Sequence, residues 1–376
     1  MKSVLVITSV ASMVDQFLFP NLELFQNMGY EVHVACNFER GNSCSGERVL
    51  ALQSRLRERN IPYYQIDFAR DVTEVLENIR AYKEVKKLVS SHKYDLIHCH
   101  SPIGGLLTRI ACRKIRKHGT TVIYTAHGFH FFKGAPIKNW ILYYPVEKIC
   151  SRWTDVLITI NQEDYSFAKR KMKSGKIEYV PGIGIDLERI TKIEVDRAEK
   201  RRELDIPDGA TLLLSVGELN KNKNHETVIR AIGDLDVYYI IAGRGELEEQ
   251  LQLTIEKLGL ANRVKLLGFR QDILELCKSV DVFVFPSFRE GLSVSVMEAM
   301  ASGLPVACSC IRGNTDLIDE NGGEMFDPYS VEDCTRAIKN LMQSDTSAKG
   351  TYNSNKIVNF SKTRVTGMLR RIIESL

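Results

Sequence analysis

Two glutamates, Glu290 and Glu298, enclose an apolar run within the almost wholly apolar stretch REGLSVSVMEAMASGLPV (289–306). The stretch follows the β-branched run DVFVFP (281–286), and Gly303 predicts the end of a helix within it. Glu298 falls inside that helix, which is apolar nearly all round and which we therefore expect to be buried. An unpaired carboxylate there would cost several kcal/mol, so a polar group must meet it.

Two kinds of partner for Glu298 are open. One is an internal hydrogen bond or a lysine from a neighbouring element. The other is a pair of vicinal hydroxyls such as those of a ribose, because an ionised carboxylate accepts two hydrogen bonds. The amides at the start of the helix would favour an anion such as a diphosphate between the two glutamates. These amides belong to Gly291, Leu292 and Ser293.

A second loop, GELNKNKNHETV (217–228), repeats this design of a strand, a glycine and a helix start. Gly217 follows the strand, and Lys221 and Lys223 precede the helix. A lysine there would suit a phosphate, although a solvated loop charge is an equally good explanation. The nearby stretch AGRGELEEQL (242–251) resembles a dinucleotide fingerprint only weakly, since it lacks the third glycine.

His127 comes directly after the β-branched run TVIYTA (121–126), which places it at the carboxyl edge of a sheet. The aromatic residues Phe129 and Phe131 follow it. Exposed aromatics beside basic residues would suit a sugar or a lipid, and packed core aromatics are the alternative.

Three arginines, Arg109, Arg113 and Arg116, recur on one face of a helix that we expect over residues 103–117. This face is either solvated or a surface for anionic lipid. The closely spaced histidines of the first half have no carboxylate or cysteine to complete a ligand set, so we expect no metal site.

Strands and amphipathic helices alternate along the whole chain, a pattern typical of parallel sheets in an α/β fold. Two series of strands predict two Rossmann-like domains, residues 1–185 and 186–355, with the boundary near the turn VPGIGID (180–186). Residues 356–376 are expected to form a C-terminal helix that crosses back to the first domain. The predicted strands are 4–8, 31–36, 94–99, 121–126, 155–160, 211–217, 237–243, 263–268, 281–286 and 304–309.

Charge is distributed unevenly over the 376 residues. The net charge is +4, but residues 1–185 hold 26 Lys and Arg against 17 Asp and Glu, which is +9. A basic front half predicts an anionic partner, either a lipid surface or a phosphorylated substrate. Nucleic acid is not expected, because no recognition motif accompanies the basic residues.

Two features bear on location. The nine cysteines include no CxxC pair, which predicts a reduced, cytoplasmic protein. No run approaches the roughly 18 apolar residues that cross a bilayer.

The strand DVFVFP, the two glutamates with seven residues between them and the phrase EAMASGLPV together resemble the retaining glycosyltransferase family 4. The phrases YDLIHCHSP, YTAHGFHF and VPGIGID support this and resemble its bacterial capsule and exopolysaccharide branch. The resemblance implies the GT-B fold, in which two Rossmann-like domains with parallel sheets face each other across a cleft.

The resemblance also implies roles for single residues. Glu298 would bind the nucleotide ribose and Glu290 the donor sugar, with backbone contacts from residues 291–293. His127 would touch the donor sugar near the reaction centre, and Lys223 would bind the diphosphate.

The nucleotide base would lie at the loop that contains Phe269 and Arg270. Glu218 stands where many members of the family have a diphosphate-binding arginine. Neutralising the leaving group would then fall to Lys221, Arg244 or Arg289.

The implied function is a metal-independent hexosyltransferase without a cofactor, peripheral on the inner face of the cell membrane. It would move a sugar from a nucleotide-diphosphate sugar, expected to be UDP-linked, to a lipid-diphosphate-linked saccharide. Two alternatives are a non-catalytic nucleotide-sugar-binding subunit, which Glu218 favours, and a GT-B epimerase, which would form product without an acceptor.

Overall fold

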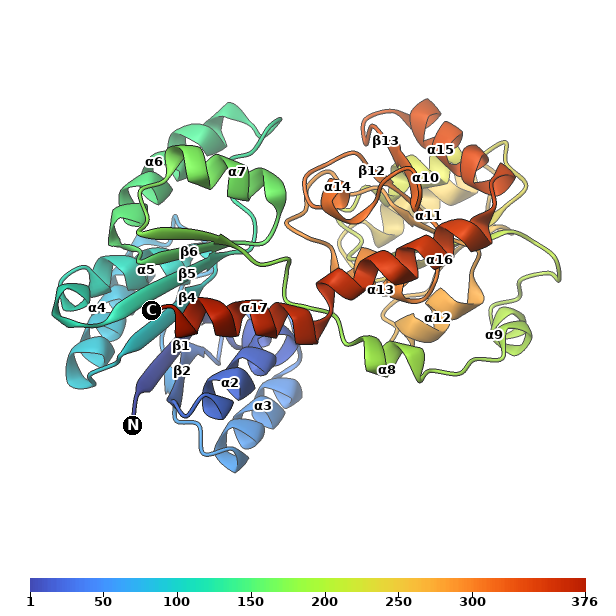
Figure 1. Cartoon of the computed structure of the whole chain (residues 1–376). Helices are drawn as coiled ribbons and strands as arrows, with labels where there is room; N and C mark the ends of the chain where they lie inside the picture. Colours follow the sequence, from blue (N-terminus) through green and yellow to red (C-terminus); the bar gives the residue numbers. More distant parts are fainter. The chain divides into compact units, whose positions relative to one another are not determined.

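The computed structural model describes all residues from Met1 to Leu376 and divides into two compact units (Figure 1). The first unit contains Met1–Ile183 and Val365–Leu376, and the second contains Gly184–Arg364. The division after Ile183 lies two residues before the boundary that the sequence predicted.

The first unit is built on a parallel sheet of seven strands in the order β3-β2-β1-β4-β5-β6-β7. Both faces of the sheet are buried, since Val4 and Val6 of β1 point into one core while Leu5 and Ile7 point into another. This double burial explains the continuous apolar run VLVI. The strands are β1 (Ser3–Val10), β2 (Glu31–Asn37), β3 (Tyr63–Gln65), β4 (Leu96–His100), β5 (Thr121–Ala126), β6 (Val156–Thr159) and β7 (Lys176–Tyr179).

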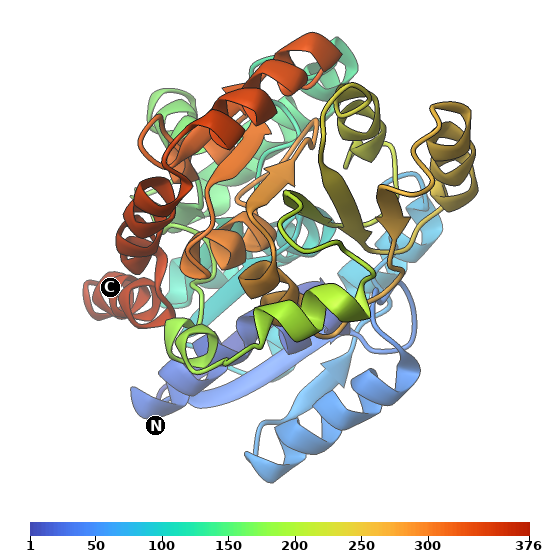
Figure 2. The same ribbon diagram turned by 90° about the vertical axis from the view of Figure 1, so that its right-hand side faces the viewer.

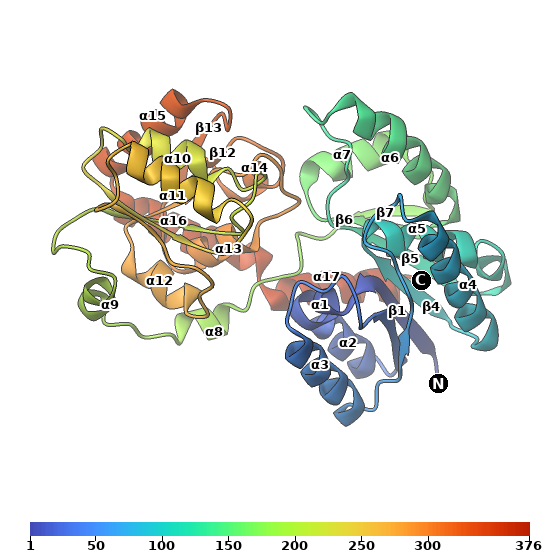
Figure 3. The ribbon, with the colours of Figure 1, turned by 180° about the vertical axis from the view of Figure 1, so that it is seen from behind.

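Helices cover both faces of the first sheet (Figure 3). The C-terminal helix α17 packs beside α2, where Val365 and Leu369 join the core formed by Leu22 and Phe25. One layer consists of α1 (Ala11–Met13), the π-helix η1 (Val14–Leu18), α2 (Phe19–Asn27), α3 (Gly46–Glu58) and α17 (Lys362–Glu374), and the other of α4 (Val75–Ser91), α5 (Pro102–Cys112), α6 (Ile137–Cys150) and α7 (Gln162–Lys171).

The second unit has a parallel sheet of six strands in the order β10-β9-β8-β11-β12-β13. Leu212 and Leu214 of β8 point into one core and Leu213 into the other, as in the first sheet. The strands are β8 (Leu212–Val216), β9 (Tyr238–Ala242), β10 (Val264–Leu266), β11 (Val282–Phe285), β12 (Val306–Ser309) and β13 (Gly323–Phe326).

Figure 2 faces the second unit, whose strands lie between helices on both sides. The core on one face includes side chains of α8, α12, α13 and η4, and the core on the other includes those of α10, α11 and α15. The helices of this unit are α8 (Leu187–Thr191), α9 (Arg197–Glu203), α10 (His225–Ala231), α11 (Glu248–Lys257), α12 (Ile273–Ser279), α13 (Val294–Ala301), α14 (Asn314–Leu317), α15 (Val331–Gln343), α16 (Thr346–Lys356) and the 3-10 turn η4 (Ile357–Phe360).

All ten predicted strands are present, each within two residues of its predicted bounds. Three strands were missed, and all three lie at an edge of a sheet: β3, β7 and β13. An edge strand buries less of its length, so short polar sequences such as YYQ and KIEY form strands without an apolar run. None of the helices combines the length and the apolar character that a membrane span requires.

The predicted face of three arginines does not exist. Helix α5 ends at Cys112, so Arg116 lies in the following 3-10 turn (Ile115–His118), where it binds Asp155. Arg109 is only 1% exposed, and its guanidinium donates to the two oxygens of Glu147 at 2.8 and 3.0 Å. Arg113 alone of the three is exposed and makes no ion pair.

Phe129 and Phe131 are also buried, so the prediction of exposed aromatics is wrong. Their rings stack at 4.9 Å, and Phe131 packs against Trp140, Tyr144 and Phe167. These two residues therefore fasten α6 and α7 to the sheet and cannot contact a ligand.

The buried ion pair between Arg109 and Glu147 can be tested by mutation. Replacing Arg109 by alanine leaves Glu147 with an unpaired, largely buried charge, so we expect the free energy of unfolding to fall by about 3–5 kcal/mol. Urea denaturation followed by tryptophan fluorescence measures it, because Trp140 and Trp153 both belong to the first unit. The matched control Arg113→Ala should change the stability by less than about 0.5 kcal/mol. Equal effects of the two substitutions would contradict the buried pair.

Candidate active site

The segment between β11 and β12 forms the helix that its sequence predicts. Ser293 caps α13, and its Oγ accepts a hydrogen bond from the Val296 amide at 3.3 Å. Met297 and Met300 are buried on the helix. The amides of the first turn of a helix have no acceptors within the helix, so this end favours negative charge.

Glu298 lies in α13, where its side chain is partly buried. The carboxylate makes no hydrogen bond or ion pair with the protein, and the two bonds from Ser302 go to the backbone carbonyl of Glu298. Burial raises the pKa of Glu298 to about 6, and the positive charge of Arg189 opposes this rise. Of the two kinds of partner that the sequence left open, the internal one is therefore not present.

Lys223 and Glu290 come from separate loops and form an ion pair. The Lys223 Nζ lies 2.7 Å from Glu290 Oε1 and 4.9 Å from the ring centre of Phe285. Both side chains are partly buried. The stem of the lysine passes over Gly217, where an added Cβ would lie 3.2 Å from the lysine Cδ and Cε.

Two asparagines hold these loops together. Asn222 Nδ2 donates to the Arg289 carbonyl at 3.1 Å, and the carbonyl of Asn222 accepts from the Phe288 amide at 2.8 Å. Asn224 has a left-handed backbone (φ 55°), and its Nδ2 donates to the carbonyls of Pro286 and Pro328. These bonds position Lys223 beside Glu290.

The two glycines of the weak fingerprint, Gly243 and Gly245, have a packing role. A Cβ on Gly243 would lie 1.8 Å from the Gly217 carbonyl oxygen, and one on Gly245 would lie 2.3 Å from the Leu219 carbonyl oxygen. Only glycine allows the loops after β8 and β9 to approach this closely. The fingerprint-like spacing is thus explained by contact between the two loops.

The other predicted donor-binding residues differ in their surroundings. Lys221, Arg244 and Arg289 are exposed loop residues, and Phe269 is 61% exposed after β10. Arg270 is already engaged, because its guanidinium binds the carboxylates of both Glu203 and Asp272. Its predicted contact with a base would compete with these ion pairs.

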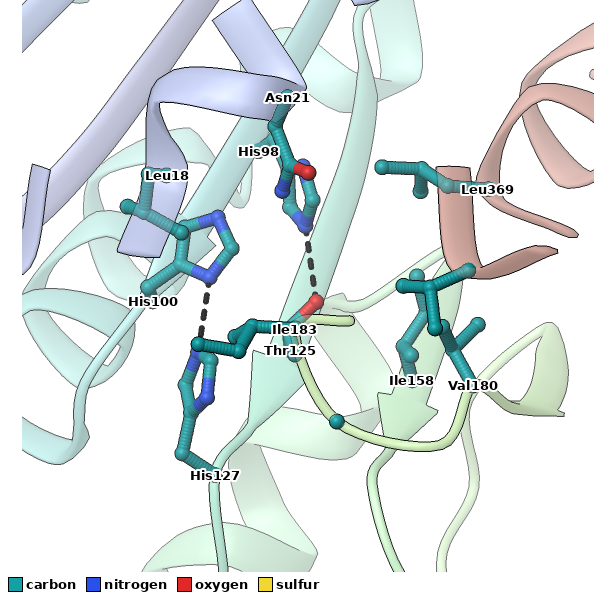
Figure 4. A pocket seen from close by; sticks show the side chains of 12 residues that line it. Leu18, Asn21, His98, His100, Thr125, His127, Ile158, Val180, Ile183 and Leu369 are labelled. Atoms are coloured by element: carbon teal, nitrogen blue, oxygen red, sulfur yellow. Dashed lines mark hydrogen bonds between the residues drawn. The ribbon is translucent and has the colours of Figure 1, made fainter. Parts of the chain in front are cut away.

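In the first unit, His127 joins a row of histidines at the carboxyl edge of the sheet (Figure 4). His127 Nε2 lies 3.1 Å from His100 Nδ1, and the rings of His100 and His98 are 4.1 Å apart. His98 Nε2 in turn lies 2.8 Å from Thr125 Oγ1. The side chain of Asn21 completes the polar part of this pocket.

Burial governs the protonation of these rings. It lowers the pKa of His127 to about 4 and that of His98 to about 3, and it lowers the pKa of His100 well below its usual value. All three are neutral at pH 7 and act there as hydrogen-bonding groups without charge. The chain contains no group of three or more His, Cys, Asp or Glu side chains in an arrangement that could hold a metal ion.

Sequence reasoning missed three contributors to these sites. Arg312 is buried, and its Nε donates to the Glu290 carbonyl at 3.1 Å, which fixes the backbone of that glutamate. Arg312 lies three residues after the end of β12. Because ligands bind at the carboxyl ends of parallel strands, this position could have been predicted from the sequence. His98 and His100 are among the closely spaced histidines that were considered only as metal ligands. In the structure His100 contacts His127, and His98 packs against His100.

Two family models together cover most of the chain. "Glycosyltransferase Family 4" matches residues 22–189, and "Glycosyl transferases group 1" matches residues 196–357. EpsD of Bacillus subtilis, named as a glycosyltransferase, is 38% identical over 333 residues, which are 85% of this chain and 82% of EpsD. The chain belongs to glycosyltransferase family 4.

The fold of this glycosyltransferase is GT-B, as the sequence predicted. Anabaena HepE, solved in complex with UDP, superposes with a TM-score of 0.78 at 19% identity, over 100% of both chains. WaaG, a glycosyltransferase involved in lipopolysaccharide biosynthesis, gives a TM-score of 0.73 at 16% identity over 99% of both. A galactosyltransferase of Escherichia coli that uses UDP-Gal and a GlcNAc-diphosphoundecaprenol acceptor is 27% identical over 85% of this chain and 80% of its own.

The raised pKa of Glu298 makes this glycosyltransferase less stable at neutral pH. The folded state holds the proton more tightly than the unfolded state, so stability is lost as pH rises from about 4.5 through 6. Glu298→Gln should therefore be more stable than wild type by about 2 kcal/mol at pH 8, with the difference vanishing near pH 4. Scanning calorimetry over this pH range measures it. Glu320→Gln, at an exposed glutamate, is the control, and a Glu298→Gln variant that matches it at pH 8 would contradict the buried charge.

Proposed function

We propose that this glycosyltransferase is a retaining hexosyltransferase that uses a UDP-sugar donor and a lipid-diphosphate-linked saccharide acceptor in bacterial surface polysaccharide biosynthesis. The observation that carries the proposal is the pair of carboxylates on either side of the first turn of α13, one with Lys223 and one without any protein partner. The UDP complex of HepE and the acceptor named for the E. coli relative support the choice of substrates.

Each group at α13 has a part in holding the donor. The Glu298 carboxylate accepts hydrogen bonds from the ribose hydroxyls, which supply the partner that the protein does not. The amides at residues 291–293 and the positive end of the helix face the diphosphate. Lys223 adds a full positive charge at the same place.

The ion pair between Lys223 and Glu290 prepares both residues for the donor. A diphosphate competes with the carboxylate for the lysine, and Glu290 is then free to accept a hydrogen bond from a hydroxyl of the sugar. The lysine keeps its charge near the leaving group, where negative charge grows in the transition state. No metal is required if Lys221, Arg244 or Arg289 adds to this charge.

In this proposal His127 orients the donor sugar. As a neutral ring it donates or accepts one hydrogen bond to the sugar, and its contact with His100 holds the ring in place. The mechanism is a front-face one, in which the departing phosphate assists deprotonation of the acceptor hydroxyl and the anomeric configuration is retained.

The acceptor lipid sets the location that we propose. Residues 1–185 carry the net charge of +9 that suits an anionic membrane surface, so the enzyme would work at the inner face of the cell membrane without spanning it.

One observation favours a second candidate, a non-catalytic nucleotide-sugar-binding subunit. Glu218, at the position of the usual arginine, is exposed and accepts a hydrogen bond from Asn220 Nδ2 at 2.8 Å. A carboxylate there opposes the charge of a diphosphate.

Turnover separates the two candidates. With a panel of UDP-sugars and a prenyl-diphosphate glycan, wild type should release UDP and extend the glycan, and Glu290→Ala should lose about 100-fold or more in kcat. Lys257→Ala, at an exposed lysine of α11, is the control and should keep wild-type turnover. Binding of UDP-sugar without any transfer, together with normal polysaccharide in cells that carry Glu290→Ala, would favour the non-catalytic subunit.

A further inference from the structure

Helix α6 has an outward face made almost wholly of large aliphatic side chains. Ile137, Ile141 and Leu142 are 77%, 67% and 60% exposed, and Val146 and Ile149 continue the same face. The exposed positions follow the helical repeat, so they form one continuous stripe of about three turns. We call this stripe the α6 face: Ile137, Ile141, Leu142, Pro145, Val146 and Ile149.

The inward side of the same helix is fully occupied. Trp140 and Tyr144 pack against Phe131 and Phe167, and Glu147 is bound by the buried Arg109. The helix is therefore fixed in place, and its aliphatic face has no partner within the first unit. A helix that is apolar on both sides belongs either in a core or against a lipid phase.

The segment that contains α6 is basic. Residues 133–152 hold four Lys and Arg, and Glu147 is their only acidic residue. Since Glu147 is neutralised from within by Arg109, no acidic side chain of α6 opposes an anionic surface. Basic residues stand before, on and after the helix: Lys133, Lys138, Lys148 and Arg152.

We propose that the α6 face inserts into the interface of an anionic lipid bilayer and so docks the first domain on the membrane. Aliphatic side chains enter the boundary between headgroups and acyl chains, while the flanking lysines and Arg152 bind the headgroup phosphates. This surface replaces the arginine face predicted from the sequence, of which only Arg113 is free.

A bilayer fits the α6 face better than a second copy of the chain does. Two copies that met through this face would bring their basic residues together, and like charges in contact oppose association. Another exposed apolar stretch, Val75, Leu76 and Ile79 at the start of α4, is interrupted by Glu77 and preceded by Glu74. Those carboxylates make it a poorer match for anionic lipid.

The α6 face is tied to the reaction through the loop that begins at His127. Asn139 of α6 donates to the His130 carbonyl at 2.9 Å, so the helix holds the chain that leads away from the catalytic histidine. Docking by this helix would hold the loop that follows His127 close to the membrane surface, where a lipid-linked diphosphate lies. The biological reason for membrane docking rests on the proposed function with its lipid-linked acceptor. The vesicle experiment below measures docking without that acceptor.

Co-sedimentation of the full chain with vesicles tests the proposal. Wild type should bind vesicles of phosphatidylglycerol and phosphatidylcholine, bind phosphatidylcholine alone far less, and lose part of its binding at high salt. The double variant Ile141→Glu/Leu142→Glu should bind the anionic vesicles about tenfold or more weakly. Leu253→Glu, at a leucine of α11 that is also 60% exposed, is the matched control and should bind like wild type.

Three outcomes would overturn the proposal: vesicle binding unchanged in the double variant, no binding by wild type, or a dimer in light scattering that the double variant dissociates. Thermal unfolding of the double variant at the wild-type temperature excludes misfolding as the cause of lost binding. Transfer to a short-chain, water-soluble acceptor analogue keeps the two proposals apart. The rate of this transfer should be equal in the double variant and wild type if the proposed transferase function is correct. Neither protein should transfer sugar if the proposed function fails.

Discussion

The proposed donor site depends on one electrostatic constraint, a carboxylate held in an apolar helix without a protein partner. Glu298 cannot move far, because α13 packs against β11 and β12 and is capped by Ser293. A charge in that position costs folding free energy unless something polar meets it. A ligand with two adjacent hydroxyls relieves that cost, so the same feature that destabilises the empty chain stabilises the complex.

The second unit is organised around this helix. The loops after β8, β9 and β11 follow neighbouring parallel strands, and glycines allow close contact between the backbones of the first two loops. Asn222 and Asn224 then join the first of these loops to the third, which places Lys223 against Glu290. In the first unit, burial keeps His127 and its neighbours neutral.

Much of the fold could be predicted from the sequence, because strands buried on both faces need continuous apolar runs and ten such runs are present. The edge strands β3, β7 and β13 could not, since they are only three or four residues long and contain no continuous apolar run. Within the site, local spacing was enough for the glutamates and the helix between them. The Lys223–Glu290 and Arg109–Glu147 pairs join residues 67 and 38 positions apart, and no local pattern reveals such pairs. For the same reason, helical spacing alone could not distinguish a solvated arginine from the buried Arg109.

The most direct test of the account compares the binding of UDP and 2′,3′-dideoxy-UDP to wild type and to Glu298→Ala by calorimetry. If Glu298 holds the ribose, wild type should prefer UDP by about tenfold or more, and Glu298→Ala should bind the two nucleotides equally, because the lost hydroxyls and the lost carboxylate are the two halves of one interaction. Equal affinity of wild type for both nucleotides would contradict the central claim.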